Sequence, residues 1–204
     1  MTAPDICPKA IADYNSRTYQ LLHTTGMSLA HVFDLNTQQK IFDVRIPRSK
    51  TRNMKWLKPY SSLFYVANQE DFIVYDERTK NSVATIKNGG SQLVNCNCSI
   101  SMPLLLLSAF ENGDISMVDF RMMNEVGNRL NTLSPITQFD VHQHLPFAVG
   151  VVGEKLMAFS YEGEELESTI QDMNYIPDSF CLHLTEASCA VRSGYNIQCV
   201  IVDY

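Results

Sequence analysis

Three pairs of residues that could bind a metal ion lie two positions apart in this sequence. They are Cys96 and Cys98, His142 and His144, and Cys181 and His183. Residues at i and i+2 of a β-strand point to the same face of a sheet, so two such pairs together could bind zinc through thiolate and imidazole ligands. Structural zinc sites, however, usually carry Cys-x-x-Cys knuckles on loops. We therefore expect buried cysteines and strand-end histidines, and we predict no metal site and no cofactor.

No other group of residues has the spacing of a catalytic site. The sequence lacks a Gly-x-Ser-x-Gly elbow, a glycine-rich phosphate-binding loop and a His-Glu-x-x-His motif. A nucleophilic cysteine would need a histidine oriented by a third group, and no sequence pattern supplies one. We predict that the protein is not an enzyme. A catalytic or metal-binding role is the least favoured hypothesis.

Composition favours a folded domain that does not bind nucleic acid and has no membrane span. The 204 residues are 45% hydrophobic, enough for a sizeable core, and the net charge of -6 disfavours binding to phosphate backbones. The start has no signal-peptide pattern, and the longest apolar run, 102–110, is far shorter than the roughly 20 residues of a membrane span. We expect a cytoplasmic protein whose strand cysteines are small buried residues: Cys96, Cys181, Cys189 and Cys199.

A short apolar phrase, usually ending in aspartate, occurs five times at nearly constant spacing. Its copies end at Asp34, Asp76, Asp119, Ser160 and Asp203, which are 42, 43, 41 and 43 residues apart. Further strand-like segments and tight turns surround each copy in the same order. In the turn 111–114 we expect Asn112 and Gly113 to supply the positive φ that a hairpin needs, and we expect Gly153 to turn a hairpin in the fourth unit. A repeat of this length is typical of the four-stranded blades of a β-propeller. A β-sandwich, the competing architecture, gives no reason for constant spacing.

The predicted fold class is therefore all-β, a propeller of about five four-stranded units in a single domain or propeller fragment. The last unit lacks its fourth strand, and the units either close a small ring or form part of a larger one. The first strand, near 11–15, has a helical turn as its alternative. The units span approximately 10–46, 53–87, 93–133, 136–171 and 180–204.

Residues 112–122 resemble the third-strand phrase of WD repeats, with a Gly-Asp turn, alternating apolar residues and then Asp-Phe-Arg. No unit has the Gly-His dipeptide of that family, so the repeats are degenerate. The tryptophan of the Trp-Asp dipeptide is replaced by Phe33, Tyr75, Val118, Phe159 and Val202.

Over 24–204 the order and spacing are similar to the C-terminal propeller of the Raptor family, the scaffold subunits of TOR complex 1. The similar segments are 112–122, 136–142 and 161–170, whereas 184–187 replace a His-Pro-His stretch of that family. The resemblance implies a non-enzymatic scaffold for protein–protein interaction in TOR growth signalling, with a TOR-type kinase subunit as principal partner. The alternative is a WD-repeat adaptor of another complex, in membrane traffic or ubiquitin ligation.

Two charged segments and one aromatic residue are further candidates for partner binding. The link between the first two units is a possible basic loop for an acidic helix, a phosphoserine or anionic lipid, or else a solvated connector; it contains Arg45, Arg48, Lys50, Arg52 and Lys55. The acidic run is expected to be a solvated rim, and it comprises Glu162, Glu164, Glu165 and Glu167. Trp56 is either a surface anchor or, as we expect, part of the core.

Overall fold

The computed structural model describes residues 11–24, 29–46, 53–57, 62–67, 71–87, 91–103, 105–119, 122, 124–162 and 165–204. Their regular structure consists of β-strands, and none of these residues belongs to a helix long and apolar enough to cross a membrane. The chain divides into two compact units, Met1–Lys87 and Asn88–Tyr204, and each is described by itself. The assignment of all 204 residues to one domain stays a prediction.

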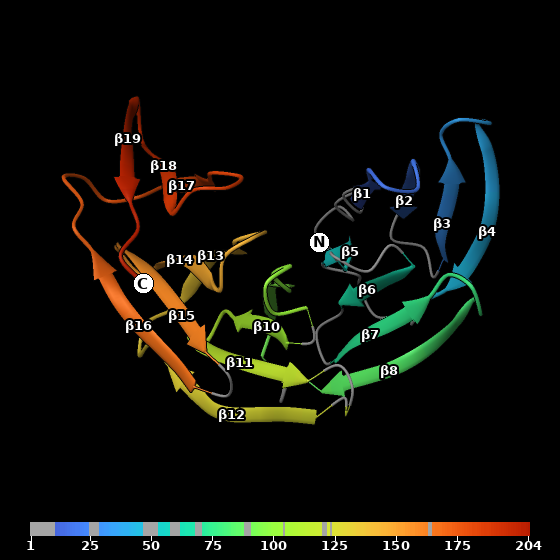
Figure 1. Ribbon diagram of the computed structural model, residues 1–204, viewed down its shortest axis with the longest axis horizontal. Coiled ribbons are helices and arrows are strands. Elements are labelled where there is room, and N and C mark those ends of the chain that lie inside the picture. The colour runs from blue at the N-terminus through green and yellow to red at the C-terminus, as the bar shows by residue number, and fades with distance from the viewer. Residues whose placement is uncertain are drawn as a thin grey trace, which may run out of the picture. The chain divides into compact units, whose positions relative to one another are not determined.

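The first unit contains two antiparallel sheets, each with its strands in sequence order (Figure 1). The segment 11–15 is a strand and not the alternative helical turn. Sheet 1 consists of β1 (Ile11–Asn15), β2 (Gln20–Thr24), β3 (Leu29–Asp34) and β4 (Gln39–Arg45). Sheet 2 consists of β5 (Asn53–Trp56), β6 (Leu63–Ala67), β7 (Asp71–Asp76) and β8 (Asn81–Lys87).

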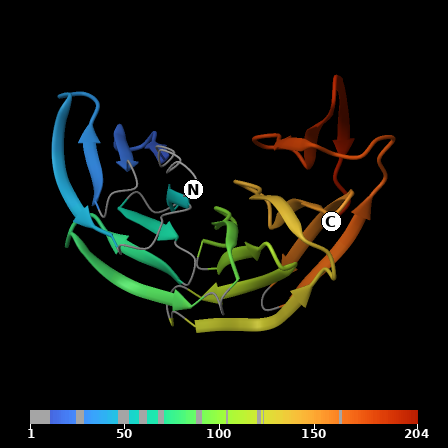
Figure 2. The same cartoon turned by 180° about the vertical axis from the view of Figure 1, so that it is seen from behind.

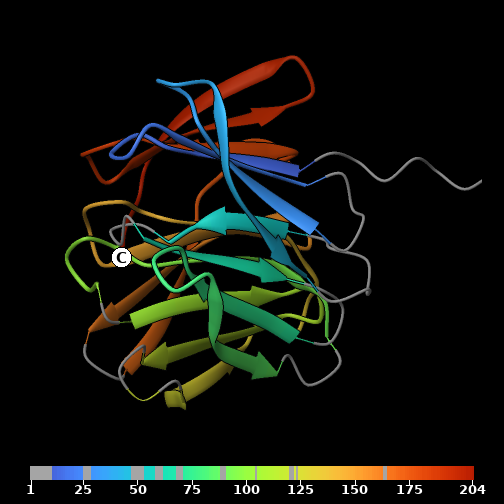
Figure 3. The same ribbon diagram turned by 90° about the vertical axis from the view of Figure 1, so that its right-hand side faces the viewer.

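The second unit contains three antiparallel sheets, which Figures 2 and 3 show from behind and from the side. Sheet 3 has β9 (Leu93–Asn97), β10 (Leu105–Phe110), β11 (Asp114–Asp119) and β12 (Asn124–Asn131). Sheet 4 has β13 (Ile136–Val141), β14 (Phe147–Val152), β15 (Lys155–Glu162) and β16 (Glu165–Gln171). Sheet 5 has three strands: β17 (Ser179–Leu182), β18 (Ser188–Ser193) and β19 (Asn196–Ile201). The predicted all-β fold class and the missing fourth strand are confirmed.

The predicted hairpin turns depend on glycine more than on asparagine. Gly113 has φ +93° and Gly153 has φ +57°, a backbone region that glycine adopts without steric cost. The expectation that Asn112 shares this conformation is wrong, because its φ is not positive. Its side-chain Oδ1 instead accepts the backbone N–H of Asp114 at 3.2 Å. A side-chain acceptor of this kind stabilises a turn without a left-handed residue.

Neighbouring sheets within each unit pack face to face through apolar side chains. Trp56 of sheet 2 is 2% exposed, lies edge-on to Phe64 with ring centroids 5.3 Å apart, and belongs to a core cluster that includes Leu22 and Val32 of sheet 1. The expected core role of Trp56 is confirmed. Burial of aromatic and branched side chains of this size is the main stabilising contribution to such a fold.

Polar side chains on the first strand of a sheet tie it to the adjacent sheet. The Asp13 carboxylate in β1 accepts the backbone N–H of Trp56 at 2.7 Å. In the second unit, Asn95 Nδ2 donates to the carbonyl of Phe139 at 2.8 Å. Gln138 repeats this role one sheet further along, since its Nε2 donates to the carbonyl of Asp178 at 3.1 Å. These bonds fix the spacing of neighbouring sheets and satisfy backbone groups at the inner edges.

Candidate functional site

The predicted basic loop lies mostly outside the described residues. Arg48, Lys50 and Arg52 belong to that undescribed part, so their role in partner binding stays a prediction. Arg45 ends β4 and is exposed. Lys55 lies within β5, where it pairs in register with Tyr65 and is half-buried. These two residues therefore flank the loop on ordered strands.

The cysteine and histidine pairs do not converge. Within the described ranges, no three His, Cys, Asp or Glu side chains are placed to hold a metal ion. Cys96 and Cys98 are both buried. Burial raises the pKa of the Cys98 thiol, and the neighbouring Cys96 raises it further. A thiol that stays protonated is a poor nucleophile and a poor metal ligand.

The expectation that all strand cysteines are buried is wrong for sheet 5. Cys181 and Cys199 are exposed, whereas Cys189 is buried and burial raises its pKa to about 11. The two exposed thiols pair in register with Ala190 on the strand between them. The three side chains therefore lie on one face of the sheet, and that face is exposed. An apolar sequence context indicates a strand, but it does not indicate which face of the strand is covered.

His142 is a structural residue that caps the turn after β13. Its Nδ1 accepts the backbone N–H groups of His144 at 3.1 Å and Leu145 at 3.0 Å. Its Nε2 lies 3.1 Å from the carbonyl of Glu186 in the next sheet and must donate to it. The ring is therefore neutral, and burial holds its pKa below the usual value. His183 caps the following turn in the same way, accepting the N–H of Glu186 at 3.0 Å.

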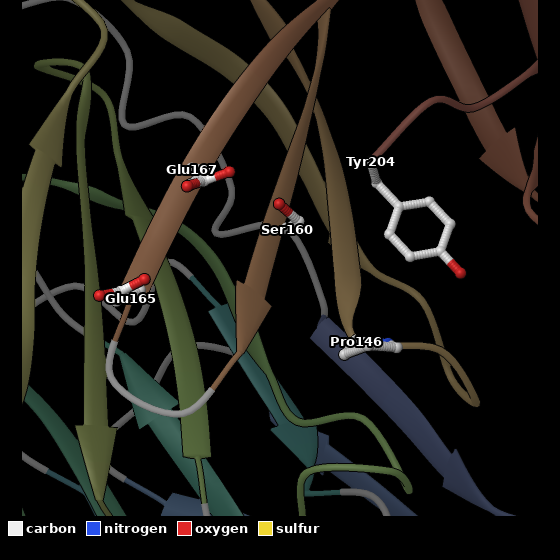
Figure 4. Close-up of a pocket in the computed structure, with 5 residues that line it drawn as sticks. All are labelled: Pro146, Ser160, Glu165, Glu167 and Tyr204. Atoms are coloured by element: carbon white, nitrogen blue, oxygen red, sulfur yellow. The ribbon is translucent and has the colours of Figure 1, made fainter.

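A pocket of about 240 Å³ opens on the second unit (Figure 4). The alternation of β16 places the exposed Glu165 and Glu167 on one face, and Ser160 of β15 pairs with Glu167 in register. Figure 4 shows the Tyr204 ring across from the two carboxylates, with Ser160 between them. The lining residues are Pro146, Ser160, Glu165, Glu167 and Tyr204.

The Tyr204 wall of the pocket is held in place by the residues that precede it. The Gln171 side chain binds the backbone of Asp203 twice, accepting its N–H at 3.0 Å and donating to its carbonyl at 2.9 Å. Thr169 Oγ1 donates to the same carbonyl at 2.6 Å. The Tyr204 ring stacks on Phe147 with centroids 4.4 Å apart. These contacts position the aromatic face before any ligand binds, which reduces the entropy lost on binding.

The pocket can accept a cationic side chain. Two carboxylates provide negative charge, and the π-face of Tyr204 attracts an ammonium or guanidinium group. Across the described residues, neither Glu165 nor Glu167 forms an ion pair. The sequence identified these glutamates only as a solvated rim. The contribution of Tyr204 was missed because it comes from a distant segment that no local spacing connects to β16.

Comparisons with known proteins show the fold. No family model and no curated protein matches the sequence. A chain of the mitotic checkpoint complex matches 94% of this chain and 60% of its own length, with 14% identity and a TM-score of 0.77. Raptor from Chaetomium thermophilum matches 100% of this chain and 20% of its own length, with 15% identity and a TM-score of 0.82. This chain therefore has a WD-repeat β-propeller type of fold. It covers less than two thirds of the length of each of these neighbours.

Proposed function

We propose that this protein is a non-enzymatic docking scaffold that acts in TOR growth signalling, with a TOR-type kinase subunit as its principal partner. The observation that carries the proposal is the match of the whole chain to Raptor at a TM-score of 0.82. The similar segments 112–122, 136–142 and 161–170 in the sequence support it independently. The proposed place of action is the cytoplasm, and the free cysteines on the strands fit a reducing compartment.

The mechanism is presentation of fixed surfaces to partners. Antiparallel sheets tied to one another by side-chain hydrogen bonds hold their strands in place, so little entropy is lost when a partner docks on them. Two segments of opposite charge are the candidates for specificity, and the basic one lies outside the described residues. The pocket with Glu165 and Glu167 suits a basic side chain, and the segment around Arg48, Lys50 and Arg52 suits an acidic or phosphorylated one.

Affinity purification of the tagged full chain followed by mass spectrometry tests the proposal. We expect recovery of a TOR-type kinase. Recovery of coat or ubiquitin-ligase subunits in its place would support the alternative of another WD-repeat adaptor, and a stable complex with neither would contradict both.

Two sets of variants then locate the docking surface. Glu165→Gln with Glu167→Gln tests the pocket, and Glu154→Gln, an exposed carboxylate in the β14–β15 turn, is the matched control. Charge reversal to glutamate at Arg48, Lys50 and Arg52 tests the basic segment. We expect at least one set to reduce kinase recovery about tenfold while the melting temperature is unchanged. Unchanged recovery in both sets would exclude these surfaces.

A further inference from the structure

The three sheets of the second unit repeat one row of side chains, which we call the trailing row. It crosses the first three strands of a sheet, and the pairing registers make its members equivalent. The trailing rows are Asn97, Leu107 and Met117 in sheet 3, Asp140, Val149 and Ala158 in sheet 4, and Cys181, Ala190 and Cys199 in sheet 5.

The apolar members of the first two trailing rows are covered, and those of the third are not. Leu107 and Met117 are 0% exposed in the cluster between sheets 3 and 4. Val149 and Ala158 are also 0% exposed, in the cluster between sheets 4 and 5. In sheet 5 the equivalent face is open. Its flanking side chains Ile197 and Ile201 are 75% and 80% exposed.

A second row of side chains, which we call the leading row, packs against the preceding sheet. In sheet 2 it consists of Trp56, Phe64 and Tyr75, which are 2%, 0% and 5% exposed and belong to the cluster shared with sheet 1. In sheet 4 it consists of Val141, Ala148 and Phe159, which are 4%, 0% and 0% exposed in the cluster shared with sheet 3.

The leading row of sheet 1 is open. The registers make Tyr14, Leu21 and Phe33 equivalent to the buried rows of sheets 2 and 4. Tyr14 is 40% exposed, and Leu21 and Phe33 are half-buried. The described part of the chain thus contains an open trailing face on sheet 5 and an open leading face on sheet 1. Exposed apolar side chains grouped on one face of a sheet mark interaction sites.

We propose that these two faces bind each other between two copies of this chain, so that sheet 5 of one copy packs on sheet 1 of the next. Within each unit, the trailing face of one sheet packs on the leading face of the next. This contact occurs between sheets 1 and 2, between sheets 3 and 4 and between sheets 4 and 5. The chain therefore has one unused trailing face and one unused leading face among its described sheets 1 and 5. Because the two faces differ, each contact is head-to-tail, with unlike surfaces on its two sides.

Sedimentation equilibrium of the full chain under reducing conditions tests the proposal, since reduction prevents cross-links through Cys181 or Cys199. We expect the average mass to rise with concentration above the 23.1 kDa monomer. Ile197→Glu with Ile201→Glu blocks the trailing face, and Tyr14→Glu blocks the leading face. Each variant alone is expected to weaken association about tenfold or more, because a buried unpaired carboxylate is costly.

Mixing the two blocked variants gives the decisive measurement. Each retains one intact face, so an equimolar mixture is expected to form a 1:1 complex of twice the monomer mass at concentrations where each variant alone is largely monomeric. Val83→Glu with Ile170→Glu, at exposed positions on β8 and β16, is the control and leaves the association unchanged. A wild-type chain that is monomeric at all concentrations would overturn the proposal, as would association that survives both variants or a mixture that does not combine.

Discussion

His142→Ala is expected to lower the free energy of unfolding by about 3 kcal/mol. The substitution leaves three backbone groups without their partner: the N–H groups of His144 and Leu145 and the carbonyl of Glu186. An unsatisfied buried group costs about 1–3 kcal/mol. The cost of each unsatisfied N–H lies at the lower end of this range, because His144 is exposed and Leu145 is half-buried in a turn that water can reach. Loss of the ring contact with Phe147, 4.7 Å between centroids, adds to the cost.

His142→Asn is the matched variant, because the fold already uses asparagine at the equivalent position of sheet 1. There Asn15 Oδ1 accepts the N–H of Arg17 at 3.0 Å. An asparagine at 142 restores an acceptor for the turn, but it is too short to reach Glu186 and does not replace the ring. We therefore expect it to cost about 1–2 kcal/mol, half or less of the cost of alanine.

The same residue makes stability depend on pH. Burial, and then the neighbouring His144, hold the pKa of His142 below its usual 6.5 in the folded state, against the raising effect of the hydrogen bond with Glu186. The unfolded chain therefore binds a proton on this ring at a higher pH than the folded chain does. Stability is fully present above pH 6.5 and is lost as the pH falls from there through the lower folded pKa.

Urea unfolding followed by circular dichroism at neutral and mildly acidic pH measures both effects. The only tryptophan, Trp56, lies in the other compact unit, so its fluorescence gives a separate signal that the substitutions are expected to leave nearly unchanged. Two results would refute the reasoning. One is an asparagine variant as unstable as the alanine variant, and the other is a pH dependence that persists undiminished without His142.

Gly113→Ala is expected to cost about 2–4 kcal/mol, because its φ is +93° and a Cβ would lie 2.6 Å from a backbone carbonyl oxygen. Gly194→Ala, at φ +57° in open space, should cost only about 1 kcal/mol of backbone strain, and equal melting temperatures would contradict this difference. A thiol reagent is expected to modify Cys181 and Cys199 in the folded monomer at least about tenfold faster than the buried Cys189, whose pKa is raised. Equal rates, measured by peptide mass spectrometry, would show that sheet 5 is covered or locally unfolded.

The sequence predicted the order of strands and sheets because those signals are local. Apolar runs, glycine turns and the spacing of about 42 residues repeat within each unit of sequence, and each sheet is built from consecutive strands. Gly113 and Gly153 occupy positive-φ positions where the turns were expected. Asn112 was assigned wrongly because an asparagine stabilises a turn in two ways, and only the three-dimensional structure distinguishes its backbone conformation from its side-chain hydrogen bond.

The candidate pocket could not be predicted, because its parts are distant in sequence and weakly marked. Glu165 and Glu167 were recognised as an acidic run, but the position of Tyr204 depends on the contact of Asp203 with Gln171. A single glutamine side chain that binds a backbone amide leaves no periodic signal. Exposure of Cys199 was unpredictable for a related reason, since it depends on whether another sheet covers the face and not on the strand that carries it.

The position at the end of the first strand, or just after it, explains how four of these sheets keep their geometry without the WD signature. It is occupied by different residue types in different sheets: Asn15, Ser99, His142 and His183. In each case a side-chain acceptor near the backbone receives an N–H of the following turn, for example Ser99 Oγ from Ser101 at 3.2 Å. Ser99 and His142 also donate to a carbonyl in the next sheet, at 3.3 and 3.1 Å. In these four sheets a hydrogen-bonding function recurs and not a residue identity, whereas sheet 2 has the apolar Leu57 at the equivalent position. Such repeats fold alike while their sequences share few identities, because several side chains of the right reach can provide the acceptor.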